Sequence, residues 1–408
     1  MQLDLGPEHQ AFRGEIREWI AHSGPPGLDK MADWYAPLMA GSSRELFEEA
    51  ERHPDYRLWE ERLAEARLIC PHWPEAFGGR GLDPIEMAIL HEELYRAGLP
   101  RITRGMGESL VGPSIIVHGT SEQKAYFLPR IIDGTDRYCQ GFSEPGQGSD
   151  LAGVETRGVV DGDEVVLTGQ KVWTSGATQA NMIFVLCRTN PGVEKHRGLS
   201  YVLVPIPGNH VEVRPIRQIS GRASAFCEEF IDGARAPLFN VIGGIDNGWR
   251  VAMTTLGNER GGRASIAHLS YERELWDLVE VARSNGRSSD PVVRQQLAWA
   301  YTQVQLMRYS GLRLLASLAA RSEPGPEASV AKLSWSEYHR RFGELALDVL
   351  GAQSLAGDEV SSGSRLGRWY EVFLLSRAGT IYSGTSEIQR NIVAERALGL
   401  PKEPTPTR

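Results

Sequence analysis

The apolar residues of this 408-residue chain change their spacing twice, and this change restricts the fold more than any other feature. From residue 1 to 136 they recur three or four positions apart, as in Phe12 and Ile16, which is the pattern of amphipathic helices. From 137 to 244, short β-prone runs are separated by turn residues. Helical spacing returns from 245 to 408. The order predicts a helical N-terminal domain, a middle β domain and a helical C-terminal domain.

The middle region is expected to form an antiparallel barrel or sandwich. No helix-length apolar pattern lies among its strands, so a doubly wound dinucleotide-binding fold is not expected. The strands are expected in the runs 164–169, 181–189, 198–206, 211–216 and 227–232.

Among the helical regions, one apolar stripe is expected through Val292 and Tyr301, and another helical stretch from Val330 onward. Asn247 is a candidate cap for the helix that follows it. The weakly periodic stretch from Gly24 to Tyr56 is expected to be a loop.

Composition excludes several classes of protein. Hydrophobic residues make up 41% and charged residues 24%, which is the balance of a globular protein. The net charge of -8 argues against nucleic acid as the main partner, since phosphate backbones require a basic surface. No stretch reaches about 18 apolar residues, and the first residues lack a signal-peptide pattern, so no membrane contact and a cytoplasmic location are expected. Four scattered cysteines show no metal-ligand spacing and are expected to be reduced thiols.

Three motifs carry groups suited to ligand binding. GFSEPGQGSDL (141–151) is a turn whose backbone N–H groups and hydroxyls can hold a phosphate, a ring edge or a thioester. GQKVWTSGA (169–177) places two hydroxyl residues after a Trp, and the segment 381–401 begins with YSGTSE before an amphipathic helix. Taken singly, each also fits an ordinary role as a surface turn, a core Trp or a helix cap.

Together, in this order and spacing, the three motifs resemble the acyl-CoA dehydrogenase family over nearly the whole chain. The resemblance implies an α-helical N-terminal domain, a central β-barrel and a C-terminal four-helix bundle. It also implies FAD at a subunit contact, usually in a homotetramer, and α,β-dehydrogenation of an acyl-CoA thioester with electrons passing to an electron-transfer flavoprotein.

The resemblance assigns roles residue by residue. Trp173 resembles the residue that shields one flavin face, and Glu387 stands where many members have Gln. The positions that resemble FAD contacts are Gln140, Phe142, Ser143, Trp173, Ser175, Thr385 and Glu387. The positions that resemble substrate contacts are Ser149, Arg260, Tyr382 and Gly384.

The catalytic base is the most informative departure from the family. The reaction needs a carboxylate in a dry pocket to take the α-proton, because desolvation makes it a stronger base. Much of the family has Glu directly after the Tyr of the terminal motif, whereas this chain has Ser383 there. Branched-chain and long-chain members instead use a Glu before an Arg early in the first C-terminal helix, and this chain has Glu259 and Arg260. Glu259 is therefore the expected base, and the main-chain N–H of Ser383 is expected to polarise the thioester carbonyl.

Two further departures leave open the contact to the FAD pyrophosphate and the contact to its adenine end from a neighbouring subunit. The family's R-x-x-F-G motif is absent, and Arg283, Arg287 or Arg294 are candidates for its pyrophosphate contact. The family's Q-x-x-G-G appears as residues 348–352, DVLGA. Alternative functions are a flavin-dependent oxidase or monooxygenase on the same scaffold, and a non-catalytic partner subunit of a heteromeric dehydrogenase. A branched or bulky acyl chain is the expected substrate, because small Ser383 replaces the usual acid.

Overall fold

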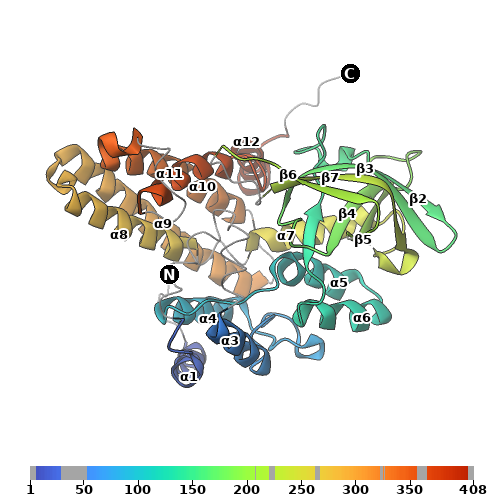
Figure 1. Ribbon diagram of the computed structural model, residues 1–408, viewed down its shortest axis with the longest axis horizontal. Coiled ribbons are helices and arrows are strands. Elements are labelled where there is room, and N and C mark those ends of the chain that lie inside the picture. The colour runs from blue at the N-terminus through green and yellow to red at the C-terminus, as the bar shows by residue number, and fades with distance from the viewer. Residues whose placement is uncertain are drawn as a thin grey trace.

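The computed structural model describes residues 6–28, 53–206, 208–219, 226–261, 267–321, 325, 327–355 and 365–402. Figure 1 shows three regions: N-terminal helices, a β-sheet beside them, and long C-terminal helices on the opposite side from the sheet. The order helical, β, helical that the spacing predicts is confirmed. Most of the expected loop from Gly24 to Tyr56 lies outside the described residues, and helix α3 begins within its last part, at Pro54.

The N-terminal helices begin where local chemistry caps them. Asp83 forms a reciprocal capping box with Glu86, and Thr120 forms one with Gln123, so the first N–H groups of both helices are satisfied. Their inward faces share one apolar core with the sheet, which includes Trp59, Trp73 and Phe184. The elements are α1 (Pro7–Ser23), α3 (Pro54–Glu65), α4 (Pro84–Arg96), the π-helical turn η3 (Gly107–Val111), α5 (Gly112–His118) and α6 (Ser121–Ile132).

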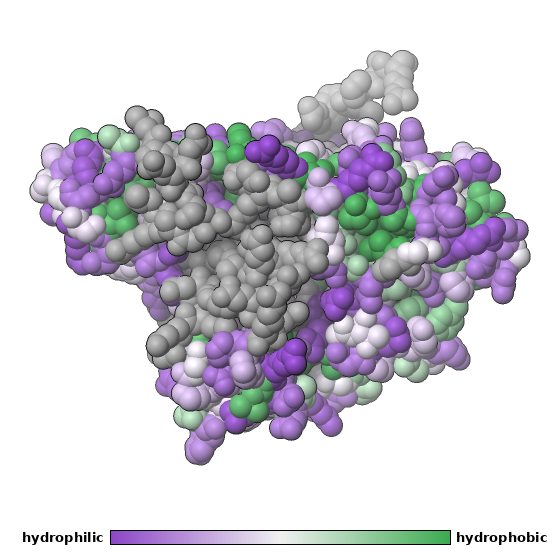
Figure 2. All heavy atoms as spheres, viewed as in Figure 1, coloured by the Kyte–Doolittle hydropathy of each residue, from purple (hydrophilic) through white to green (hydrophobic). Residues whose placement is uncertain are grey.

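The β region is a single eight-stranded sheet with the order β6-β7-β3-β2-β4-β5-β8, and β1 pairs with β4. All five expected strands are present, although β3 and β7 are each twelve residues long. The strands are β1 (Tyr138–Gly141), β2 (Arg157–Asp161), β3 (Glu164–Ser175), β4 (Met182–Arg188), β5 (Leu199–Pro205), β6 (Val211–Pro215), β7 (Phe226–Pro237) and β8 (Val241–Ile242). Figure 2 shows hydrophobic residues grouped over this sheet on the face viewed.

The expected closed barrel is wrong: among the described residues the sheet is open, with β6 and β8 as its edges. The chain leaves β8 after two residues through Gly243 and Gly244, which both have left-handed φ values of 79° and 86°. This bend directs the chain into α7 (Gly248–Gly261). Strand β8 therefore has only two residues, which pair with β5 and leave little backbone for a further strand. The helix begins directly after Asn247, as the sequence suggests.

The C-terminal helices pack around a second apolar core that contains Tyr338, Phe342 and Trp369. Val292, Tyr301 and Val330, which the spacing placed on apolar stripes, are instead exposed, because these helices have more apolar residues than one buried face can hold. The helices are α8 (Ala267–Ser284), α9 (Pro291–Arg321), α10 (Glu327–Leu350), α11 (Arg365–Gly379) and α12 (Ser386–Ile392).

Of the helices in the described ranges, none combines the length and the apolar character that crossing a membrane would require.

The four cysteines are all buried and free: Cys70, Cys139, Cys187 and Cys227. Burial raises the pKa of each thiol. A raised thiol pKa leaves little thiolate at neutral pH, which lowers the reactivity of these buried thiols.

Candidate active site

The first motif runs from the end of β1 across to β3. Gln140 lies on β1 and is half-buried, and the ring of Phe142 is buried edge-on against Phe184, with ring centroids 5.6 Å apart. The backbone N–H of Val172 donates to the carbonyl of Ser143 at 3.0 Å. This bond holds Ser143 beside the strand that carries the second motif. Only the backbone of Phe142 is left to face a ligand, since its ring is part of the core.

Trp173 is the exposed residue of a β-bulge. The pairing of β3 with β7 shifts between Val172 and Thr174, and Trp173 has φ 66°, a left-handed value that is rare for a bulky side chain. The bulge turns Trp173 away from the core, so its side chain is 63% exposed while Thr174 is buried. An unstrained strand would have placed this indole inside. Backbone strain that exposes a large aromatic ring is typical of ligand sites.

Behind this bulge lies a buried ion pair that the sequence analysis did not single out. Lys171 Nζ lies 2.8 Å from Glu144 Oε1, and the lysine side chain is fully buried. Burial opposes ionisation of Glu144, but Lys171 and the hydrogen bonds from residues 155 and 156 outweigh it and lower the pKa of this carboxyl. Little in the sequence signals this pair, because β3 contains other polar residues besides Lys171 and its alternation alone does not show which of them are buried.

A second carboxyl group lies next to the same lysine. Glu229 on β7 pairs in register with Lys171 on β3, and Thr174 Oγ1 donates to Glu229 Oε2 at 2.5 Å. The Oε1 atom of Glu229 has no hydrogen-bond partner among the described residues. Burial is the main cause that raises the pKa of Glu229 to about 7, and the charge of Glu228 adds to it.

The terminal motif forms a tight turn before α12. Ser383 and Gly384 are consecutive left-handed residues with φ 54° and 85°. The buried Gln389 donates from Nε2 to the carbonyl of Ser383 at 3.0 Å, which fixes the plane of the peptide that follows Ser383. A Cβ at Gly384 would lie 2.5 Å from the same Nε2 atom. Gln389 was missed in the sequence analysis, although it lies one helical turn after Thr385.

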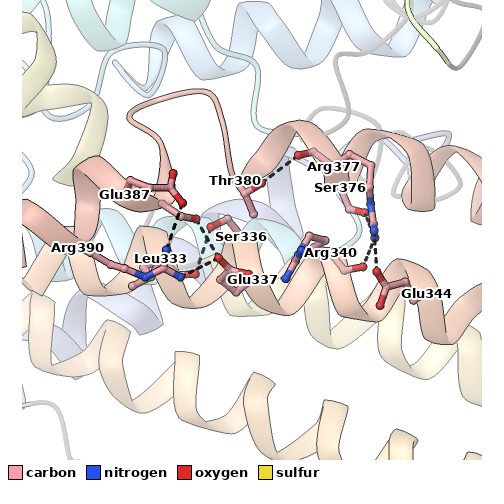
Figure 3. Close-up of polar contacts among 11 residues, drawn as sticks. Leu333, Ser336, Glu337, Arg340, Glu344, Ser376, Arg377, Thr380, Glu387 and Arg390 are labelled. Atoms are coloured by element: carbon pink, nitrogen blue, oxygen red, sulfur yellow. Dashed lines mark hydrogen bonds and ion pairs between the residues drawn. The ribbon is translucent and has the colours of Figure 1, made fainter. Parts of the chain in front are cut away.

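Thr385 caps α12, since its Oγ1 accepts from the N–H of Ile388 at 3.2 Å. Glu387 follows in the first turn and is exposed. Figure 3 shows how polar contacts hold this helix start against α10. Ser386 Oγ donates to Glu337 Oε1 at 3.0 Å, and Arg390 Nη2 lies 3.3 Å from the same oxygen. The turn is thus fixed at both its backbone and its helix.

Tyr382 lies beside α10, with its ring centroid 6.1 Å from that of Trp335, and is 38% exposed. Ser149 is also exposed, on the loop after β1. Ser175 ends β3 and is half-buried. The structure therefore brings the first motif next to Trp173 on the sheet, and it places the terminal motif on the C-terminal helices.

Glu259 and Arg260 lie in the last turn of α7, and their side chains fall outside the described residues. In Figure 1, α7 lies between the sheet and the long C-terminal helices, and it packs against β5, α5, η3 and α10. Ser114 Oγ lies 2.8 Å from Thr255 Oγ1, and both residues are buried, so α5 anchors the helix one turn before Glu259.

The three candidate arginines lie at the surface around the α8–α9 connection. Arg283 pairs with Glu280 at 2.5 Å, and Arg287 lies 3.6 Å from Asp290. Arg294 is exposed on α9. The described partners of Arg283 and Arg287 are acids or carbonyls close to them in the fold. Within the parts of the chain that the structure describes, no group of His, Cys, Asp and Glu is arranged to hold a metal ion.

Family comparisons agree with this architecture. Models of the acyl-CoA dehydrogenase N-terminal, middle and C-terminal domains match residues 6–135, 139–233 and 246–398. The chain belongs to the acyl-CoA dehydrogenase family, whose members are flavoproteins. It is an oxidoreductase that dehydrogenates acyl-CoA thioesters.

Individual relatives give a finer view. The chain is 44% identical to acyl-CoA dehydrogenase IpdE1 of Mycobacterium tuberculosis, over 97% of this chain and 98% of that protein. Among solved structures it is similar to the Tcur3481–Tcur3483 steroid ACAD, with a TM-score of 0.81, 30% identity and coverage of 99% and 100% of the two chains. It is also similar to the ChsE4–ChsE5 complex from Mycobacterium tuberculosis, with a TM-score of 0.75, 28% identity and coverage of 99% and 100%.

Proposed function

We propose that this chain binds FAD and that Glu259 removes the α-proton of a branched or bulky acyl-CoA. The observation that carries the proposal is the position of α7. This helix is anchored to α5 through Thr255 and packs against both the sheet and α10, so its last turn, with Glu259, lies near the junction of the regions that hold the motifs. Ser383 occupies the usual position of the base and has no carboxylate.

Each of these residues has a proposed role in the reaction. Glu259 takes the proton, and the N–H of Ser383 polarises the thioester carbonyl in the turn that Gln389 fixes. Ser149, Arg260, Tyr382 and Gly384 contact the substrate. FAD, when bound, supplies the acceptor for the β-hydride.

The residues on the sheet fit a flavin ring. Trp173 is exposed on a strained bulge directly beside the backbone of Ser143, and a planar aromatic ligand would cover its indole. We assign Gln140, Phe142, Ser143, Trp173 and Ser175 to this end of FAD. At the phosphate end the fit is weaker, because two acids lie at this helix start: Glu387 in the first turn, and Glu337, which accepts from Ser386. Anions favour unopposed N–H groups at a helix start.

This weaker fit supports assembly with other subunits. A homotetramer or homodimer with FAD at the subunit contact is one form. A heteromer with a second related chain is favoured by two observations: Arg283 and Arg287 are engaged with their own neighbours, and two similar solved structures are named as pairs of proteins. We further propose a cytoplasmic location, an electron-transfer flavoprotein as acceptor, and packing of α8 to α11 as the four-helix bundle of the family.

The bulky substrate is supported by the small Ser383 and by the likeness to a protein named as a steroid ACAD. A panel of straight, branched and ring-containing acyl-CoA thioesters, mixed with the enzyme without oxygen, ranks substrates by bleaching of flavin absorbance. Faster bleaching by straight-chain thioesters would contradict a bulky substrate. Lack of bleaching by any thioester would favour the oxidase or non-catalytic alternative.

The decisive variant is Glu259→Gln. We expect it to keep bound FAD and to lose substrate-dependent flavin reduction by about a hundredfold or more, because a general base contributes about 10²–10⁴ in rate. Ser383→Ala is the matched control, since it keeps the main-chain N–H and should change the rate much less. An active Glu259→Gln enzyme would remove the assignment of the base.

A further inference from the structure

The ammonium group of Lys171 has three N–H bonds, and each one has an acceptor. Nζ donates to Glu144 Oε1 at 2.8 Å, to the carbonyl of Leu186 at 2.8 Å and to the carbonyl of Phe142 at 3.1 Å. Because the side chain is fully buried, no water competes for these bonds. The lysine on β3 therefore ties β4 and the start of the GFSEP loop to its own strand.

The carboxylate of Glu144 closes the same loop at its base. Oε2 accepts from the N–H of Glu155 at 2.7 Å, and Oε1 accepts from the N–H of Thr156 at 2.8 Å as well as from Lys171. Glu144 also exchanges two backbone hydrogen bonds with Gln147. The loop from 144 to 156, which carries Ser149, thus begins and ends on one side chain.

The Lys171–Glu144 pair joins three elements, of which the proposed function assigns two to the flavin and one to the substrate. These are the backbone of Phe142 and Ser143, the exposed Trp173 two residues after Lys171, and the loop that carries Ser149. We propose that Lys171 and Glu144 are positioning residues that hold the flavin-facing backbone and the substrate-facing loop in one fixed geometry. The proposal rests on the proposed assignment of these elements to FAD and substrate.

Physical chemistry separates this role from simple stabilisation. Replacing both members of a buried ion pair with neutral residues of similar size is often neutral or stabilising, whereas removing one member leaves a buried charge alone. If the pair served only stability, replacing both residues together would therefore leave the enzyme's activity unchanged. A pair kept for positioning could not be replaced in this way, since an apolar side chain in place of Lys171 has no N–H to donate to the carbonyls of Phe142 and Leu186.

The test compares Lys171→Met, Glu144→Gln and the double variant as purified FAD-loaded enzymes. We measure the thermal midpoint, the flavin content, the visible flavin spectrum, and flavin reduction by saturating acyl-CoA without oxygen. We expect each single variant to be less stable. We expect the double variant to regain most of the lost stability, yet to show a shifted flavin spectrum and a reduction rate lower by about tenfold or more, because small misplacements of bound groups are costly.

Glu93→Gln is the matched control, because Glu93 is also a buried carboxylate, paired with Arg13 and Arg17 at 2.6 and 2.7 Å between α1 and α4. It should lower stability without changing the flavin spectrum or the rate at saturation. The proposal is overturned if the folded, FAD-loaded double variant reduces its flavin at the wild-type rate. It is also overturned if the double variant does not fold, since the pair would then be a requirement of folding.

Trp173→Ala separates this proposal from the assignment of the flavin face. If Trp173→Ala changes the flavin spectrum and the double variant does not, the positioning role alone fails. If neither variant changes the spectrum, the assignment of this face to the flavin fails as well.

Discussion

At the scale of single residues, Glu229 couples folding to pH. Its pKa is raised to about 7, mainly by burial, although the hydrogen bond from Thr174 and the nearby Lys171 favour the charged form. An unfolded glutamate has a pKa near 4.3, so between about pH 4.3 and 7 the folded protein binds one more proton than the unfolded chain. The contribution of Glu229 to the free energy of unfolding is therefore fully present below pH 4.3 and is lost as pH rises to 7.

Glu229→Gln should remove this loss of stability with rising pH, because glutamine does not titrate. We expect the free energy of unfolding of the variant, relative to wild type, to rise between pH 5 and pH 8 by about 2–3 kcal/mol at most. Urea unfolding at the two pH values measures it. Equal differences at both pH values would show that Glu229 is ionised in the folded protein. Glu15→Gln, at an exposed acid paired with Arg80, is the control and should show little change.

The orientations of the Trp173 and Lys171 side chains could not be predicted from the sequence. Strand alternation places positions 171 and 173 on the same side, yet Lys171 is buried and Trp173 is exposed. The bulge between them reverses the alternation, and it depends on pairing with β7, some fifty residues further on. The motif could be recognised from the sequence, but the direction of its side chains could not.

At the scale of elements, the turn before α12 depends on a backbone conformation that only glycine adopts freely. Gly384→Ala should lower the free energy of unfolding by about 1–2 kcal/mol, because a left-handed residue with a Cβ is strained. The added Cβ would also displace Gln389, which holds the carbonyl of Ser383, so substrate-dependent flavin reduction should slow.

Gly14→Ala is the matched control, since Gly14 lies in α1 and a Cβ there meets no atom within 4 Å. The same substitution should raise the free energy of unfolding by about 0.5–1 kcal/mol. Chemical denaturation of both variants gives the comparison. A Gly384→Ala protein as stable as wild type would mean that the turn can adopt another conformation.

Elements were largely predictable where periodicity is strong. The five expected strands and the helical regions follow from spacing that burial enforces. Strands β1, β2 and β8 were missed, because β1 and β8 have only four and two residues and β2 is exposed at four of its five positions. The open sheet could not be foreseen, since whether the edge strands β6 and β8 meet depends on pairings between distant parts of the chain.

At the scale of the whole molecule, subunit composition decides how FAD is held. If a second related chain completes the phosphate end of the site, this chain purified alone should contain well under one FAD per chain. Flavin absorbance against protein concentration measures the content, and light scattering measures the mass. A stoichiometrically loaded homotetramer would contradict the heteromer.

Residues 144–156 form an excursion from the sheet whose two ends are both fixed by the carboxylate of Glu144. Arg188 on β4 also holds the carbonyl of Ala152 at 2.6 Å, whereas at the tip a Cβ added at Gly146 or Gly148 would meet no atom within 4 Å. The tip can therefore diverge in length and chemistry while the surface beneath it keeps its shape. Under the proposed assignment of Ser149 to the substrate, substrate contacts can change at this tip during evolution while the backbone of Phe142 and Ser143 stays as it is.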